Sequence, residues 1–262
     1  MNNYIKSIVV IFFVAFPISL QAQEIVGGYS LGYGKYLMDD MKSLQKNEIK
    51  NMKLRYGEEF KYKSTETFPD DWLHNAYIGV KFSFHEIGLK YDYLTTGGRN
   101  HWADYSGEIK NDVTIAGNAM GLYYKFHFLS LPISNQFRFT ANAGVSTGAI
   151  YNRVKNDYLF DIYDPKPSPS IGNNPVKVDE SMKLNSTNWY IQPNIGFQFW
   201  FKKNLSLNFD AGYLFDKQGK IHTADTTTGF YEKSGAEYDL GIDWSGLRLS
   251  VGIGFAFSAV RK

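Results

Sequence analysis

The segment Leu247–Phe257, with the sequence LRLSVGIGFAF, decides the fold. It has an apolar residue at every second position, and arginine, serine, glycine or alanine between them. A period of two is typical of a β-strand with one apolar face, because successive side chains point to opposite sides of the sheet. A tilted strand crosses a bilayer with about 9–11 residues, which this segment matches.

The same alternation recurs along the chain and predicts seven further strands. They cover approximately residues 25–36, 75–84, 87–93, 119–128, 137–149, 189–201 and 205–215. The connections alternate between long and short, and membrane barrels have long extracellular loops and short periplasmic turns. The sequence therefore predicts an all-β fold, a transmembrane antiparallel up-and-down β-barrel of about eight strands, with long extracellular loops and both termini in the periplasm.

Aromatic residues at the strand ends support a membrane location. Phe84, Phe128, Phe137, Phe201 and Phe257 lie beside the short turns or the last strand end, and Trp72, Tyr93, Tyr151, Trp189 and Phe215 lie near the opposite ends. Aromatic rings gather at the two interfaces of a membrane. The alternative is a water-soluble lipocalin-like barrel with its apolar faces inside, but the polar faces carry Lys, Arg, Asp and Asn, so this arrangement conflicts with the charge pattern.

The composition excludes several kinds of partner, site and membrane protein. The chain has 262 residues, 28 Lys+Arg against 26 Asp+Glu and a net charge of +2, so we expect no nucleic-acid partner. It has no cysteine, which excludes disulfides, thiolate metal sites and a cysteine nucleophile. A mean hydropathy of −0.33 is too polar for a helical membrane protein, whereas a barrel is apolar on only one face of each strand.

The N-terminal 22 residues have the features of a secretory signal peptide. Lys6 supplies the positive charge, Ile8–Leu20 the apolar core, and Ala22 a small residue for cleavage. We expect residues 1–22 to be removed, leaving residues 23–262 as a single barrel domain in the outer membrane.

The longest inserts are expected on the extracellular side. Within residues 38–72, methionines and aliphatic residues recur at helical spacing, Asp39 and Asp40 can cap the start of a helix, and Gly57 can end it. Such a helix either packs on its own loop and the barrel rim, which we favour, or binds a partner or the membrane surface. Residues 155–185 contain four prolines and are expected to lack regular structure, and residues 216–239 form a last polar loop.

This pattern resembles the small eight-stranded outer-membrane barrel proteins of Gram-negative bacteria. The resemblance covers the chain after residue 22 and consists of strand pattern and loop lengths, without a catalytic motif. Such barrels include structural proteins, adhesins, assembly factors and a few enzymes, so the resemblance implies a fold and leaves the function open.

The inward face is predicted to carry a polar network. Its members are Lys81, Lys90, Asp92, Lys125, Arg138, Asp210 and Arg248. If His85 and Glu86 form a tight turn, Lys81 lies opposite Lys90, and Asp92 should bridge these like charges. Pro193 should cause a local irregularity in its strand, because proline lacks the amide hydrogen of the ladder.

Glycines also accumulate on the inward face, which leaves two interpretations. Glycine weakens a strand, so its accumulation needs a reason. Either the glycines make room for Tyr77, Tyr123, Tyr190 and Trp200, or they line a small basic cavity for an anionic or amphipathic ligand.

We therefore expect a non-enzymatic outer-membrane barrel, surrounded by lipid, that acts through its extracellular loops. Residues 38–72 and 155–185 are the candidate surfaces for a protein partner in an assembly, in secretion or in adhesion; envelope integrity is a further role. The alternative is a narrow channel or ligand-binding barrel, and an outer-membrane hydrolase ranks third. His101–Asp104 and His222–Asp225 are close His–Asp spacings but lack a serine context, so we expect no catalytic residue, cofactor or metal site.

Overall fold

The computed structural model describes residues 23–57, 60–105, 107–162, 176–201, 204–219, 221–223, 231–233, 236–238 and 240–258. The expected signal segment, residues 1–22, lies outside the described residues. No helix in the described ranges has the length and the apolar character needed to cross a membrane.

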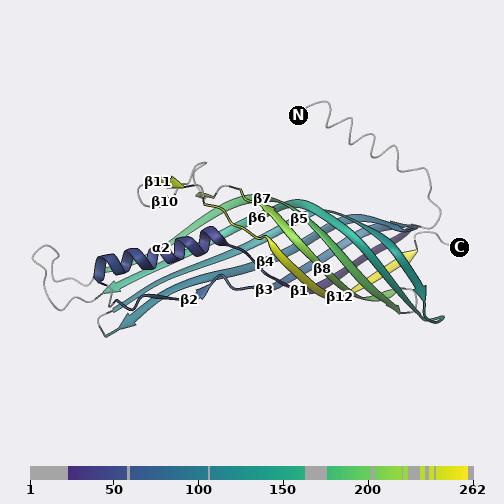
Figure 1. Cartoon of the computed structure of the whole chain (residues 1–262), viewed down its shortest axis with the longest axis horizontal. Coiled ribbons are helices and arrows are strands. Elements are labelled where there is room, and N and C mark those ends of the chain that lie inside the picture. The colour runs from purple at the N-terminus through teal and green to yellow at the C-terminus, as the bar shows by residue number, and fades with distance from the viewer. Residues whose placement is uncertain are drawn as a thin grey trace, which may run out of the picture.

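Eight antiparallel strands form a closed ring (Figure 1). They are β1 (Gln23–Gly34), β3 (Asp71–Phe82), β4 (His85–Asp104), β5 (Gly107–Pro132), β6 (Phe137–Ile162), β7 (Val176–Phe201), β8 (Leu205–Lys217) and β12 (Gly246–Ser258). The first and last strands pair with each other, from Glu24 opposite Ser258 to Gly34 opposite Arg248. The prediction of an eight-stranded up-and-down barrel is confirmed.

A belt of exposed apolar side chains surrounds the ring. All ten residues of the two expected aromatic girdles are exposed, with Trp72 at 63% and Trp189 at 65%. The short connections β3–β4, β5–β6 and β7–β8 lie at the end of the ring where β1 begins and β12 ends. This end is the periplasmic side of an outer-membrane barrel, and the opposite end is extracellular.

Four strands continue far beyond the apolar belt, which corrects two loop predictions. β4 and β5 stay paired up to Asp104 and Gly107, and β6 and β7 up to Ile162 and Val176. Residues 95–104 and 107–112, which were expected as a polar connection between two spanning strands, and residues 155–162 and 176–185 are therefore strand; the four prolines lie within residues 163–175, outside the described residues. Outside the membrane a strand needs no lipid-facing apolar side chains, so the pattern that revealed the spanning strands ends at the interface.

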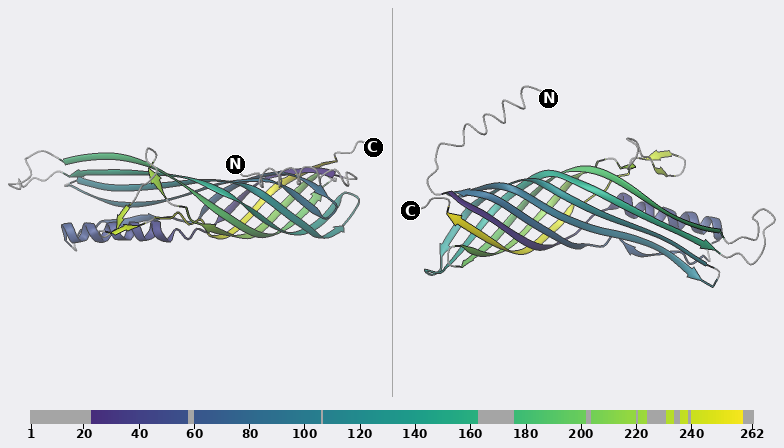
Figure 2. Two further views of the ribbon diagram at one scale, coloured as in Figure 1. Left: turned by 90° about the horizontal axis from the view of Figure 1, so that it is seen from above. Right: turned by 180° about the vertical axis from the view of Figure 1, so that it is seen from behind.

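A helix and a short strand complete this extension, which we call the platform (Figure 2). The platform consists of residues 95–104, 107–118, 151–162 and 176–188, together with α2 (Asp39–Tyr56) and β2 (Lys63–Thr67). The predicted helix is confirmed and ends at Gly57, but Asp39 and Asp40 do not cap it: they lie in its first turn, and Met38 occupies the N-cap position without a side-chain hydrogen bond. It packs on its own chain, as favoured, because Met41, Gln45 and Met52 are buried against the platform.

The extracellular mouth of the ring is filled by two chain segments that were not predicted to lie there. Residues 35–38 and 240–245 run side by side, with backbone hydrogen bonds from Leu37 to Ser245 and from Met38 to Asp243. Ile242 and Trp244 are fully buried there. They join the main apolar cluster, which also contains Tyr36, Met38, Met41, Phe68, Leu73, Leu94, Ile115, Ala119, Ile150, Val154, Leu184, Tyr190, Leu214, Ile221 and Leu240.

The last polar loop contains short strands. β9 (His222–Thr223) pairs with β7, and β10 (Tyr231–Lys233) pairs with β11 (Ala236–Tyr238). The irregularity expected at Pro193 is confirmed: β7–β8 pairing runs to Ile191 opposite Phe215 and resumes at Asn194, whereas pairing with β6 is uninterrupted.

Candidate functional sites in the lumen and on the platform

All seven residues of the predicted polar network extend from strands of the ring towards its interior, where they form three layers. In the periplasmic layer, Glu86 is 2% exposed and accepts a hydrogen bond of 2.9 Å from the Tyr123 hydroxyl. The second Glu86 carboxylate oxygen lies 2.9 Å from His127 Nε2. Lys81 lies directly opposite Glu86 in the β3–β4 register. A buried carboxylate thus has a cation and two hydrogen-bonding partners around it, as the cost of desolvating a charge requires.

Two cations of this layer lie over one tryptophan ring. Lys81 Nζ and the Arg138 guanidinium lie 5.9 Å and 5.1 Å from the centre of the Trp200 ring. Cations over the face of an indole ring are attracted by its quadrupole. Trp200 also packs with Val26 and Ala256 in a small apolar cluster, which closes the periplasmic end of the lumen.

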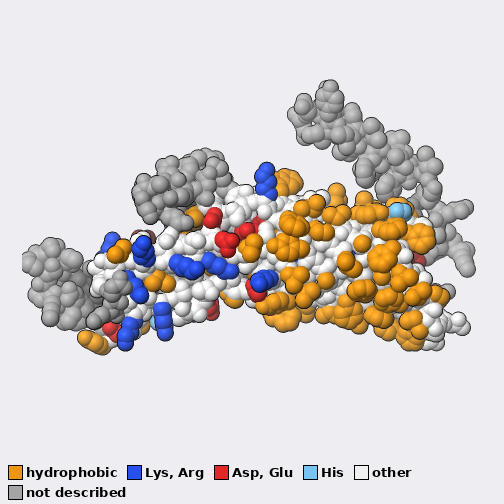
Figure 3. All heavy atoms as spheres, viewed as in Figure 1, with side chains coloured by type: hydrophobic (Ala, Val, Ile, Leu, Met, Phe, Trp, Pro, Cys, Tyr) orange, Lys and Arg blue, Asp and Glu red, His pale blue; other side chains and the backbone are white. Residues whose placement is uncertain are grey.

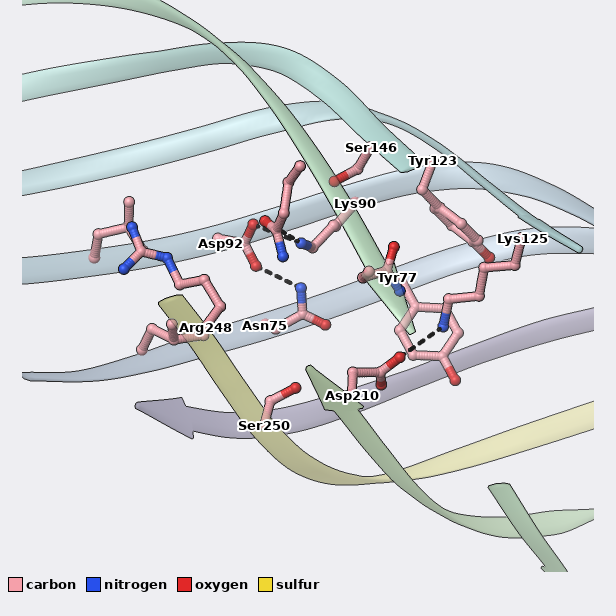
Figure 4. A pocket seen from close by; sticks show the side chains of 14 residues that line it. Asn75, Tyr77, Lys90, Asp92, Tyr123, Lys125, Ser146, Asp210, Arg248 and Ser250 are labelled. Carbon is pink, nitrogen blue, oxygen red and sulfur yellow. Dashed lines mark hydrogen bonds and ion pairs between the residues drawn. The ribbon is translucent and has the colours of Figure 1, made fainter. Parts of the chain in front are cut away.

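The middle layer contains two ion pairs (Figure 4). Lys125 Nζ lies 3.7 Å from Asp210 Oδ1 and 4.7 Å from the centre of the Tyr77 ring. Lys90 Nζ lies 3.1 Å from Asp92 Oδ2 on the same strand. Each lysine of this layer therefore has its own aspartate, and the layer is neutral as a whole.

Arg248 forms the third layer, below the mouth. Its guanidinium donates hydrogen bonds to the carbonyl oxygens of Lys35, at 3.2 Å, and Trp244, at 2.6 Å. It also lies 4.6 Å from the centre of the Tyr36 ring. Arg248 therefore binds the two segments that fill the mouth and holds them on the barrel.

The predicted pairing of Lys81 with Lys90 is wrong. The turn between β3 and β4 is formed by Ser83 and Phe84, with Ser83 at a positive φ of 55°, so Glu86 belongs to β4. Lys90 consequently lies opposite Tyr77, and Asp92 forms an ion pair with Lys90 and accepts a hydrogen bond from the Asn75 amide instead of bridging two lysines. Glu86 on β4 and Glu24 on β1 are the carboxylates that lie directly opposite Lys81.

A small cavity of about 50 Å³ remains between the layers. Its walls include Asn75, Tyr77, Lys90, Asp92, Tyr123, Lys125, Ser146, Gln192, Asn194, Asp210, Arg248 and Ser250. Ligand pockets have volumes of roughly 300–1,000 Å³, so this space suits ordered waters between the charged side chains. It is too small for the anionic or amphipathic ligand that the glycine-rich face suggested.

The inward glycines make room for aromatic rings, as the first of the two interpretations states. A Cβ on Gly88 would meet the backbone carbonyl oxygen of Ile78 and would lie 2.7 Å from the Tyr123 ring. A Cβ on Gly28 would lie 2.7 Å from the Tyr77 ring, and one on Gly121 would lie 2.6 Å from the Tyr190 hydroxyl. Alanine at these positions would overlap with a ring or a backbone atom, so glycine is needed.

The platform encloses a second cavity, of about 190 Å³, between α2 and the sheet. Its walls combine the apolar side chains of Met41, Leu44, Phe68 and Val113 with the polar side chains of Gln45, Glu48, Asn100, Asn111 and Asn156. Three donors converge on Glu48: the Tyr62 hydroxyl at 2.6 Å and the amides of Asn100 and Asn111 at 2.8 Å each. Burial and the Glu48 charge raise the pKa of Tyr62, which therefore stays protonated and donates. These bonds hold α2 on the sheet.

An open groove of about 650 Å³ lies at the far end of the platform. It is lined by Tyr56, Phe60, Lys61, Lys63, His101, Trp102, Ala103 and Asp104. The Phe60 ring lies 4.8 Å from Trp102 and 5.1 Å from Tyr56, measured between ring centres. An aromatic cluster beside basic side chains in an open groove has the composition of a protein-binding hot spot.

The outer surface divides into an apolar half and a charged half (Figure 3). On the platform, the Asp112 carboxylate lies 2.5 Å from Arg99 and 2.7 Å from Lys110. Partial burial acts to raise the pKa of Asp112, but hydrogen bonds from Arg99 and Lys110 outweigh it and lower that pKa. Within the described ranges, no three His, Asp or Glu side chains are grouped so as to hold a metal ion.

No family model and no curated protein matches the sequence. Among solved structures, the chain is similar to the outer membrane protein OprG of Pseudomonas aeruginosa, with 14% identity, a TM-score of 0.41, and coverage of 91% of this chain and 97% of that one. It is also similar to the N-terminal β-barrel domain of P. aeruginosa OprF, with 13% identity, a TM-score of 0.32, and coverage of 90% and 100%. A third similar structure is Ail of Yersinia pestis, solved with a heparin analogue, with 13% identity, a TM-score of 0.30, and coverage of 90% and 99%.

The chain is an outer-membrane β-barrel protein. Its own closed ring and its apolar belt with two aromatic girdles carry this assignment. The role of the seven lumen residues as a functional site stays a prediction.

Proposed function

We propose that this protein is a closed, non-enzymatic outer-membrane barrel that presents a rigid extracellular platform to a protein partner. The observation that carries the proposal is the length of the four strands β4–β7, which have 20 to 26 residues each. A membrane crossing needs only about 9–11 residues, so roughly half of each strand serves another purpose. Functional surfaces commonly lie on segments that a rigid scaffold positions.

The groove at the end of the platform is the proposed contact surface. One side of the groove consists of Tyr56, Phe60, Lys61 and Lys63 from residues 38–72, and the other side consists of residues 101–104 at the end of β4. The sheet therefore positions both sides. In the other candidate surface, residues 155–162 and 176–185 belong to the platform parts of β6 and β7. Aromatic and cationic side chains in a groove supply large contact area and charge complementarity to a partner.

The filled lumen supports this proposal over the channel alternative. Apolar clusters lie at both ends of the barrel, and the cavity between them, of about 50 Å³, is far smaller than the roughly 300–1,000 Å³ of a ligand pocket. The two ordered histidine–carboxylate pairs, His127–Glu86 and His101–Glu108, are accounted for as structural contacts. We therefore include no catalytic step.

The proposal is tested by affinity purification of tagged full-length protein from native outer membranes after chemical cross-linking. The groove variant Y56A/K61A/K63A removes one aromatic ring and two charges from the rim. The matched control L54A/K46A/K50A removes one large apolar side chain and two charges from the exposed part of α2. We expect recovery of a stoichiometric partner to fall at least about tenfold for the groove variant and to persist for the control. Equal recovery from both variants, or a wild-type protein that purifies alone, would contradict the proposal.

A further inference from the structure

We infer that three cations on the outer face of the platform, Arg153, Lys155 and Lys183, bind the phosphate groups of lipid headgroups in the extracellular leaflet. We call these residues the basic cluster. All three side chains are exposed. The inference concerns the lipid that surrounds the barrel and is independent of the proposed protein partner.

The position of the basic cluster follows from strand alternation. Tyr151, 52% exposed, belongs to the extracellular aromatic girdle, and Arg153 and Lys155 follow it on the same face of β6. With a rise of about 3.3 Å per residue and a tilt of about 40°, they lie about 5 Å and about 10 Å above the girdle. The headgroup region extends about 5–8 Å beyond the hydrocarbon on each side. Arg153 is therefore at the level of the headgroups, and the long side chains of Lys155 and Lys183, one row higher, can bend towards them.

The arrangement of the three charges is unfavourable without an anion. Lys155 and Lys183 are directly opposite each other on β6 and β7, and Arg153 is two residues from Lys155 on the same face. Like charges directly opposite each other on one face of a sheet repel. A bound phosphate between them would convert this repulsion into attraction.

Carboxylates compensate only part of this charge. Asp157 lies 2.6 Å from Lys155, and Asp112 on the neighbouring strand binds Arg99 and Lys110. No carboxylate of the described residues forms an ion pair with Arg153 or Lys183. The row nearest the membrane is thus cationic, and the carboxylates lie one row farther from it.

This order of charges matches an anionic membrane surface. Each lysine or arginine near such a surface contributes attraction that decays within a Debye length, so cations belong next to the headgroups and carboxylates away from them. The acyl chains of the bilayer already cover the apolar belt. The basic cluster adds a polar contact directly above them.

The inference is tested with the full-length protein in neutral detergent. A fluorescent bis-phosphorylated glucosamine-disaccharide lipid is titrated into it, and so is the same lipid after both phosphates have been removed. We expect wild type to bind the phosphorylated form at least about tenfold more tightly, and the preference to weaken as salt is added. The variant R153Q/K155Q/K183Q should lose this preference.

A second variant controls for net charge. K46Q/K50Q/R55Q removes three exposed cations from α2 and should keep the wild-type preference. Circular dichroism and heat-modifiable electrophoretic migration verify that both variants fold. A preference that survives in R153Q/K155Q/K183Q, or that falls equally in both variants, would overturn the inference. It would also be overturned if soluble short-chain polyphosphate bound to the cluster and wild type did not distinguish the phosphorylated lipid from the dephosphorylated one.

Discussion

At the scale of single residues, the lumen depends on one buried carboxylate. Glu86 faces Lys81 across the β3–β4 ladder and contacts Tyr123 and His127. The variant E86Q keeps the shape of the side chain but removes its charge, which takes away the buried one of the two carboxylates opposite Lys81. We expect a loss of about 3–5 kcal/mol in the free energy of unfolding, measured by urea titration in lipid vesicles.

An exposed carboxylate supplies the comparison. Glu108 lies 3.0 Å from His101 on the platform, and its side chain is 43% exposed. E108Q should change the free energy of unfolding by less than about 1 kcal/mol, because exposed ion pairs contribute little. Similar losses for E86Q and E108Q would show that burial is not what makes Glu86 important.

The sequence predicted which residues face inward but not which of them meet. Alternation alone assigns a side chain to a face, so Lys81, Lys90 and Asp92 could be placed in the lumen. Their partners depend on the turn, because a shift of the turn by two residues moves every opposite pair. The turn consists of Ser83 and Phe84, so it contains no glycine, asparagine or proline that would mark it in the sequence. Phe84 also continues the apolar alternation.

At the scale of elements, the spanning strands and α2 were predictable and the platform strands were not. Lipid imposes an apolar face on each spanning strand, and helix spacing with an ending glycine reveals α2. The platform strands contact water on their outer face and α2 on part of the other, so no single-period pattern marks them. The apolar alternation of Leu240, Ile242 and Trp244 does indicate a buried segment, and this signal was available in the sequence.

The ion triad of Asp112 predicts how the β4–β5 extension responds to acid. The pKa of Asp112 is lowered in the folded protein, so its stabilising contribution is complete above the unfolded pKa of about 3.9 and is lost as the pH falls through the folded value. Amide exchange of residues 95–118 should therefore be slower in wild type than in D112N at neutral pH. This difference should vanish at strongly acidic pH. Comparison at each pH cancels the intrinsic dependence of exchange on acidity.

A double variant checks that the effect belongs to this triad. Arg99 donates to both carboxylate oxygens of Asp112, at 2.5 Å and 3.2 Å. If these bonds account for the protection, R99Q/D112N should exchange about as fast as D112N alone, since one change already removes the pair. Strictly additive effects of the two substitutions would instead assign the protection to other contacts.

At the scale of the whole molecule, the barrel is a polar layer between two apolar caps. Trp244 belongs to the extracellular cap and Trp200 to the periplasmic one, and both are buried. The ion pairs between them fill an interior that is only wide enough for side chains, as is usual for about eight strands. Such a molecule isolates the two sides of the membrane and leaves its exposed platform as the surface for recognition.

Closure at both ends predicts a specific behaviour in planar lipid bilayers. Wild type should produce no ion-conductance steps, and each single variant, W200A or W244A, should stay closed because the other cap remains. The double variant W200A/W244A should conduct, since water can then enter from both ends and reach the charged middle layer. The control W72A/W189A removes two tryptophans that are 63% and 65% exposed on the lipid-facing surface and should not conduct. Steps from wild type would favour the channel alternative, whereas a double variant that folds but stays closed would show that the lumen side chains alone close the barrel.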